Sequence, residues 1–179
     1  DIDVSGAGWG AGTWGRGTWG SASSDAIVTS TLRLWSHDNF GEDLLINVRD
    51  GGIYYWDETN TVSSRAVDIT SLAGSDSAPT IAKQVLVSDR DRHVIAFGCD
   101  TEANPGVQDP LAIRFSDQES LTDWRTQTTN TAGELRLGSG SEIVTALETR
   151  QQILVFTDTT LYSMQFLGPP FTFGVNALS

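Results

Sequence analysis

Alternating acidic residues and a histidine give this sequence its most direct suggestion of metal chemistry. Asp89, Asp91 and His93 are spaced two residues apart. In an extended segment such residues share one face, and carboxylate and imidazole groups together can bind a divalent cation. The interleaved Arg90 and Arg92 would neutralise the carboxylates, so the pattern favours a charge-balanced hairpin turn over a metal site.

A second acidic group surrounds the other histidine of the chain. Asp38, Glu42 and Asp43 lie close to His37 in a stretch, Ser36 to Glu42, that we expect to be a long turn. Calcium is one interpretation and solvation of the turn is the other, which we favour. With two histidines and one cysteine, the chain offers no set of residues with zinc-site spacing. We predict no metal and no cofactor.

Catalytic motifs are weak. Serines, aspartates and two histidines are present, but the G-x-S-x-G elbow of many hydrolases is absent. Asp117 and Glu119 form the kind of acidic pair that glycosidases use. The segment from Ser116 to Trp124 has the outline of a sialidase aspartate box, but its aspartate follows the serine directly, its glycine is missing, and its tryptophan comes one position late. We predict no catalytic residues and no enzyme.

The first twenty residues differ in composition from the rest. They contain G-x-G-x-x-G twice, at 10–15 and 15–20, but without the preceding strand and following helix that a dinucleotide fingerprint needs. Trp9, Trp14 and Trp19 recur every five residues, a period of no regular element. We expect an irregular segment over residues 1–24 whose tryptophans anchor it to its own domain or to a neighbouring subunit, with stacking on sugars or bases as the alternative.

The charge of the chain argues against a nucleic-acid-binding module. Its 179 residues include 11 Lys and Arg against 23 Asp and Glu, a formal net charge of −12, and its single lysine is Lys83. Binding to phosphate backbones requires clustered cations. Cys99 cannot form an internal disulfide, and we expect a buried, inert thiol. We also expect no membrane insertion. Since the chain begins at Asp1, it can be a processed or partial product.

From residue 25 onward the sequence predicts an all-β domain, because short runs of β-branched and aromatic residues alternate with polar turns. We place the strands in three sets of three, which define blade-like units at about 27–57, 80–116 and 141–167. The expected strands are Thr31–Trp35, Asp43–Val48 and Ile53–Trp56; Ile81–Val87, His93–Phe97 and Leu111–Phe115; and Glu142–Leu147, Gln152–Phe156 and Leu161–Phe166.

Repetition at 50 to 60 residues, with nearly continuous apolar middle strands, is typical of β-propeller blades and favours a propeller over the alternative, a β-sandwich. Three units are too few to close a ring of about 4 to 8 blades. We therefore expect a partial propeller completed by other polypeptide, with sheet edges that need partners.

Several strings resemble virion structural proteins of tailed bacteriophages, in particular the propeller-bearing tail nozzle or tail tubular proteins of short-tailed phages. With the Gly/Trp-rich beginning they span Gly6 to Gly174. They are Phe40–Asn47 (FGEDLLIN), Gly52–Asp57 (GIYYWD), Ile113–Gln118 (IRFSDQ) with Asp123 and Trp124, Gly133–Gly140 (GELRLGSG) and Leu161–Gly174 (LYSMQFLGPPFTFG).

The resemblance implies a non-enzymatic ring component of the virion tail, commonly in six copies, that contacts other tail or adaptor proteins and encloses the channel through which the genome leaves. Double-stranded DNA would pass through it without specific binding, in keeping with an acidic, lysine-poor chain. A carbohydrate-binding or depolymerising tail protein that contacts the host surface is the alternative function. It would use Trp9, Trp14 and Trp19 or the region of Asp117 and Glu119.

Overall fold

The structure is a computed structural model that describes residues 33–168 and 170–178. Within this part the chain is all-β, with one short 3-10 turn, η1 (Ile69–Ser71). The proposed anchors Trp9, Trp14 and Trp19, and the predicted boundary between residues 24 and 25, lie outside the described residues. No helix in the described part is long and apolar enough to span a bilayer.

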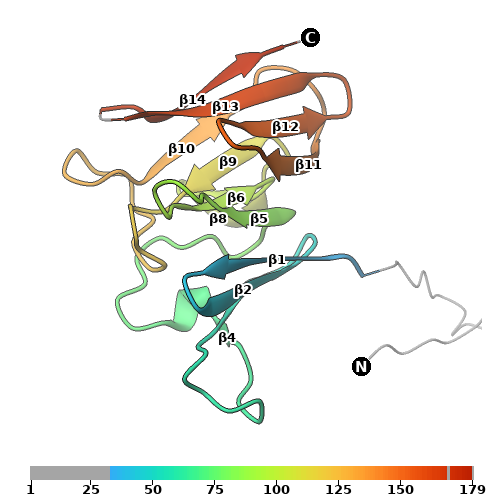
Figure 1. Cartoon of the computed structure of the whole chain (residues 1–179). Helices are drawn as coiled ribbons and strands as arrows, with labels where there is room; N and C mark the ends of the chain where they lie inside the picture. The colour runs from blue at the N-terminus through green and yellow to red at the C-terminus, as the bar shows by residue number, and fades with distance from the viewer. Residues whose placement is uncertain (1–32, 169, 179) are drawn as a thin grey trace, which may run out of the picture. The chain divides into compact units, whose positions relative to one another are not determined.

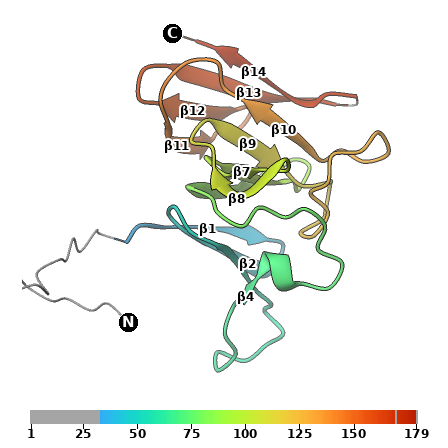
Figure 2. The same ribbon diagram turned by 180° about the vertical axis from the view of Figure 1, so that it is seen from behind.

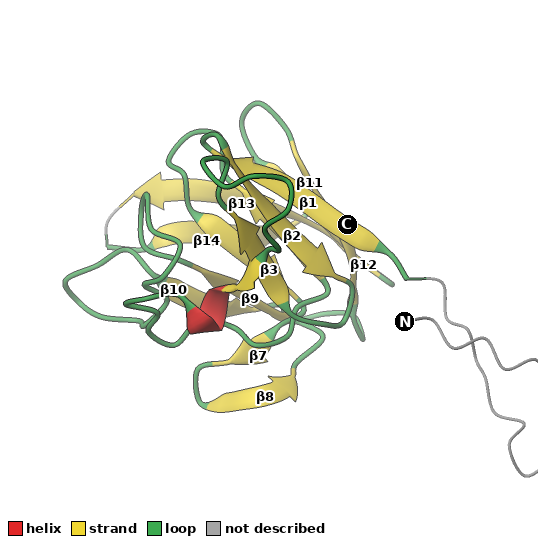
Figure 3. Ribbon diagram, turned by 90° about the horizontal axis from the view of Figure 1, so that it is seen from below, coloured by secondary structure: helices red, strands yellow, loops and turns green. Residues whose placement is uncertain are grey.

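Three four-stranded antiparallel sheets follow one another along the chain (Figures 1 and 3). The first contains β1 (Trp35–Phe40), β2 (Asp43–Val48), β3 (Ile53–Trp56) and β4 (Val67–Asp68). The second contains β5 (Gln84–Val87), β6 (Val94–Phe97), β9 (Ala112–Phe115) and β10 (Gly133–Arg136). The third contains β11 (Ile143–Glu148), β12 (Ile153–Thr157), β13 (Leu161–Gly168) and β14 (Thr172–Ala177).

Each sheet is a meander in which every strand pairs with the next strand of the same sheet. The second sheet is interrupted between β6 and β9 by a small hairpin of β7 (Asp100–Thr101) and β8 (Asn104–Gln108), visible from behind in Figure 2. In all three sheets the first strand lies at one edge and the last strand at the other. The chain therefore runs from the last strand of one sheet to the first strand of the next.

The second sheet is covered by apolar side chains on both faces. In β6, Val94 and Ala96 belong to a core shared with the first sheet, whereas Ile95 and Phe97 belong to a core shared with the third. All four residues of this strand are buried. Because neighbouring residues of a strand point to opposite faces, an unbroken apolar run is what a strand between two sheets requires.

Most predicted strands agree with the structure to within three residues. The first, Thr31–Trp35, begins outside the described residues, and in its described part only Trp35 belongs to a strand. The expected turn from Ser36 to Glu42 is mostly strand β1, and the chain reverses at Gly41. Gly41 has φ +72°, a conformation that glycine adopts without steric cost. The polar sequence of β1 concealed the strand, since four consecutive polar residues, Ser36 to Asn39, lie between Trp35 and Phe40.

The last strand of each sheet was also missed: β4, β10 and β14. β4 has only two residues, and β10 and β14 each include a glycine, so none of them has a strong strand pattern of its own. Each forms because a neighbouring strand offers an unpaired edge. The sheets therefore have four strands where the sequence predicted three.

A buried polar network fixes the connections around the second sheet. The carboxylate of Asp100 accepts hydrogen bonds from the backbone N–H groups of Thr80, Ile81 and Gly106. Arg114, only 3% exposed, donates to the backbone oxygens of Asp100 and Ser77. Full satisfaction of such groups makes their burial tolerable and fixes one arrangement of the loops.

We expect Phe97→Ala to lower the free energy of unfolding by about 3–5 kcal/mol, because it opens a cavity between the second and third sheets. The ring of Phe97 is completely buried. Val107→Ala, on the exposed β7–β8 hairpin where Val107 is 66% exposed, is the matched control and should change stability by less than about 0.5 kcal/mol. Chemical denaturation of both variants measures the difference. Equal effects would show that Phe97 does not contribute to the core.

Candidate functional site: the converging edge of the three sheets

The first strands of the three sheets lie beside one another. β1 contacts β5, and β5 contacts β11, although each belongs to a different sheet. No backbone ladder joins these strands in the described residues, because each is the edge strand of its own sheet. The converging edge, as we call β1, β5 and β11 together, is where the sheets are connected most closely.

Side chains of β1 cap the open edge of β5. The backbone N–H of Val85 donates to Ser36 Oγ at 3.2 Å, and that of Val87 donates to Asp38 Oδ2 at 2.8 Å. An edge strand leaves alternate amides unpaired, and buried unpaired amides are costly. The polar side chains of β1 therefore accept the hydrogen bonds that a paired strand would otherwise accept from β5.

Gln84 caps β11 in the same way. Its side-chain amide donates to the carbonyl of Ala146 and accepts from the N–H of Ala146, both at 2.8 Å. Arg49 adds a bond to the carbonyl of Val144 at 3.3 Å. Each sheet is thus fastened to the next by side chains that bind the backbone of its edge strand.

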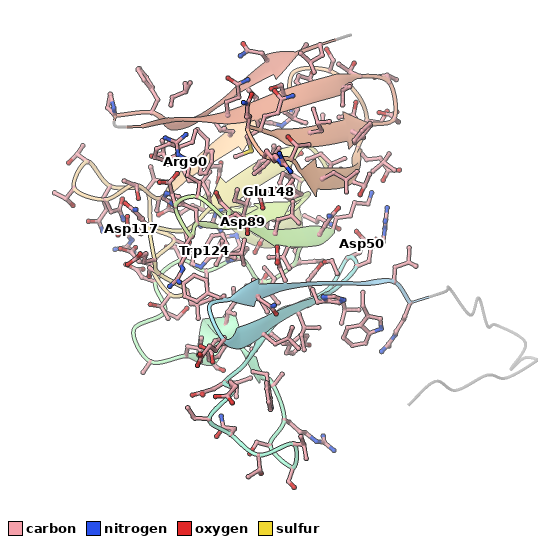
Figure 4. The ribbon with its side chains drawn as sticks, in the orientation of Figure 1. Asp50, Asp89, Arg90, Asp117, Trp124 and Glu148 are labelled. Carbon is pink, nitrogen blue, oxygen red and sulfur yellow. The ribbon has the colours of Figure 1, made fainter. Side chains whose placement is uncertain are left out.

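Carboxylates gather at one end of this edge. Glu148, at the end of β11, accepts a hydrogen bond from the N–H of Asp89 at 3.1 Å, and Figure 4 shows the two residues close together. Partial burial raises the pKa of Glu148; the N–H of Asp89 opposes this rise, and the negative charges of Asp89 and Asp38 add to it. Each of the three sheets, or the turn that follows its first strand, supplies one of these acidic groups.

A hollow of about 240 Å³ lies along the converging edge. Its lining comes from all three first strands and includes Trp35, Arg49, Lys83, Gln84 and Thr145. Lys83 pairs with Glu142, and Arg49 is bonded to backbone, so both cations already have partners. The hollow is consequently a polar groove without a free cation among these lining residues.

Asp89, Asp91 and His93 do not lie together on one face as a metal site would need, whereas the favoured hairpin turn between β5 and β6 is confirmed. Asp89 is exposed, while His93 is completely buried between sheets. A left-handed residue, Arg92 (φ 49°), turns the chain between them. Asp91 Oδ2 lies 3.7 Å from Arg90 Nε, so the turn is locally charge-balanced.

His93 has a structural position instead. Its Nδ1 lies 2.8 Å from the carbonyl oxygen of Ser116, and its ring packs beside Phe115, Phe166 and Phe173. Within the described part of the chain its Nε2 has no hydrogen-bond partner. His93 is therefore part of the packing between the second and third sheets.

Two of the three acidic residues near His37 have structural partners, whereas Glu42 is exposed. Asp43 accepts from the Tyr55 hydroxyl at 2.7 Å and from the N–H of Glu58, while Asp38 caps β5. The Tyr55 pKa rises through burial and through the hydrogen bond and charge of Asp43. In residues 33–168 and 170–178, no three His, Cys, Asp or Glu side chains are placed to hold a metal ion.

Asp117 stabilises a turn. Its Oδ1 accepts from the N–H of Thr131 at 2.8 Å and from the Thr131 hydroxyl. Burial opposes these bonds, yet their net effect is a lowered pKa for Asp117. Glu119 is exposed and has φ 54°. A general acid needs a raised pKa, so Asp117 does not suit that role.

Cys99 is completely buried, as the sequence predicted. Burial raises its pKa to about 12; the charge of Arg114 opposes this rise, and the charge of Asp100 adds to it. The thiol is therefore protonated at neutral pH and is a poor nucleophile.

The converging edge itself was not predicted. Ser36, Asp38 and Gln84 carry no motif, and their role depends on strands from different sheets lying side by side. One signal was available: β1 contains four consecutive polar residues, and a glutamine opens β5. Such residues can indicate an exposed turn as readily as an inter-sheet contact.

We expect Gln84→Ala to destabilise the protein by about 1–3 kcal/mol, because it leaves the N–H and carbonyl of Ala146 without their partner. Gln118→Ala removes an exposed glutamine outside the converging edge and serves as the control, with little change expected. Urea denaturation measures both. Unchanged stability in Gln84→Ala would contradict the capping role.

Glu148→Gln should stabilise the fold at neutral pH. A raised pKa means that folding favours the protonated carboxyl, so ionised Glu148 is a cost that appears as pH rises through the folded-state pKa. Because the group is only partly buried, we expect less than about 1 kcal/mol. The gain should vanish below the unfolded-state pKa of about 4.3. Thermal melts across pH, with Glu58→Gln as an exposed control, test this; a gain independent of pH would contradict it.

No protein-family model matches this chain, and no curated protein matches it at a significant level. The function therefore has to be inferred from the residues and their geometry.

Proposed function

We propose that this chain is a non-enzymatic structural subunit of a phage tail, a nozzle or tubular component that forms part of an oligomeric ring around the DNA exit channel. The observation that carries the proposal is the repetition of one meander sheet three times, each fastened to the next at its first strand. Successive blades of a propeller are connected in this way, from the last strand of one to the first strand of the next.

Repeated sheets of this kind leave apolar surface at both ends of the series. Trp35 on the first sheet is 56% exposed, and Leu147 on the third is 57% exposed. Large exposed apolar side chains on a sheet face favour contact with another protein surface. This supports a subunit that works in an assembly.

The identified chemistry supports architecture over catalysis. Asp117 holds a turn, Asp38 caps an edge strand, and Cys99 is buried. The phage assignment comes from the resemblance of the strings between Gly6 and Gly174, which the fold does not contradict. Within a ring, carboxylates such as Asp89 and Glu148 would repel passing DNA and limit its adhesion.

The proposal predicts that the chain is a component of phage particles, located in the tail. Mass spectrometry of purified particles should detect it at a fixed ratio to portal protein, and electron cryomicroscopy should place it around the tail channel. Tailless heads from the same preparation are the control and should lack it. A chain absent from particles, or one present only in heads, would overturn the assignment.

A further inference from the structure

The three sheets are similar at the level of individual cross-strand pairs. On the face of the second sheet that meets the third, Leu86 is paired with Ile95 and Phe97 with Ile113. Ile95, Phe97 and Ile113 are completely buried, and Leu86 packs against the same core. These four side chains form the surface on which the third sheet rests.

The third sheet carries the same pairs on its outward face. Leu147 is paired with Leu154, and Phe156 with Leu161, from the same strands of the meander as the four residues above. No sheet of the described chain covers them, and Leu147 is 57% exposed. This face therefore carries the same kinds of apolar pairs as the buried face of the second sheet, but no described sheet covers it.

The face of the third sheet that packs on the second sheet also has an equivalent, on the first sheet. The third sheet rests on the second through the pairs Val155–Tyr162 and Ile153–Met164, all buried. In the first sheet the equivalent pairs are Ile46–Tyr54 and Leu44–Trp56. Their neighbours Leu45 and Ile53 point into the core, so strand alternation places Ile46 and Tyr54 on the outward face.

We propose that the outward face of the third sheet packs against the outward face of the first sheet in a second copy of this chain. The contact between the second and third sheets provides the template: Val155–Tyr162 and Ile153–Met164 lie on Leu86–Ile95 and Phe97–Ile113. The new contact would place Ile46–Tyr54 and Leu44–Trp56 of one copy on the outward third-sheet face of the other. That face carries Leu147–Leu154 and Phe156–Leu161. The inference rests on the proposed role in an oligomeric ring, to which it adds the surfaces used.

Because this contact joins two different faces, each copy can make two such contacts. One uses its first-sheet face and the other uses its third-sheet face. Such a heterologous contact closes into a ring when its rotations complete a full turn. Two copies would supply six sheets, within the range of about 4 to 8 that closes, whereas three copies would exceed it. We therefore expect a dimer, and a ring of six copies would contain three such pairs.

The test uses two variants of the full chain, each placing a lysine on one face. Ile46→Lys alters the first-sheet face, and Leu147→Lys alters the third-sheet face. Val107→Lys, on the exposed β7–β8 hairpin, is the control of matched chemistry. Circular dichroism and thermal melts establish that each variant is folded, and Tyr54→Lys and Leu154→Lys replace any that is not.

Analytical ultracentrifugation should find dimers for the natural sequence and for Val107→Lys. Ile46→Lys and Leu147→Lys should each be monomeric, with dimerisation weakened at least about tenfold. An equal mixture of the two should form dimers again through one contact, because Ile46→Lys keeps an intact third-sheet face and Leu147→Lys keeps an intact first-sheet face. The second contact joins the two altered faces and stays open, so these dimers should be weaker than those of the natural sequence. Restoration by mixing is specific to contact between different faces.

Three results would overturn the inference: a natural sequence that stays monomeric at the highest soluble concentration, a single variant that remains dimeric, or a mixture that remains monomeric. A monomer would mean that other polypeptide covers these faces. That outcome would leave the tail assignment standing, since the composition of particles tests it separately. Conversely, a dimer absent from particles would leave the contact standing and remove the tail function.

Discussion

The burial of one sheet face against the next is the interaction on which this structure depends. No single sheet here can bury its own apolar side chains, because a sheet of four short strands is only one layer thick. The second sheet is stable because Val94 and Ala96 face one neighbour while Ile95 and Phe97 face the other. The same requirement leaves the outward faces of the first and third sheets in need of a covering layer.

Stacking alone does not fix how sheets are aligned, because apolar contacts are non-directional. The converging edge supplies direction. Ser36 and Asp38 bind successive alternate amides of β5, and Gln84 binds both backbone groups of Ala146, so a shift of one residue would break the bonds. Side-chain caps therefore set the alignment of neighbouring sheets, while the cores provide most of the driving force. The two kinds of contact cooperate at the same strands.

Polar chemistry in the described part of the chain serves this architecture. Asp100 and Arg114 are buried and bonded to connecting loops, Asp117 holds a turn, and His93 lies among aromatic rings. Groups with these partners cannot reach a substrate without breaking the bonds that stabilise the fold. This use of polar groups within the fold supports the proposed structural role in a tail.

The sequence alone determined the all-β class and the interior strands of the sheets, because an unbroken apolar run such as Val94–Phe97 indicates a strand that is buried on both faces. Only the tertiary structure decided where β1, β4, β10 and β14 form and what Ser36, Asp38 and Gln84 do. Those strands are short, polar or glycine-containing, and they exist because a neighbour offers hydrogen bonds. The role of a capping side chain likewise depends on a backbone about 50 to 60 residues away, which no local pattern can specify.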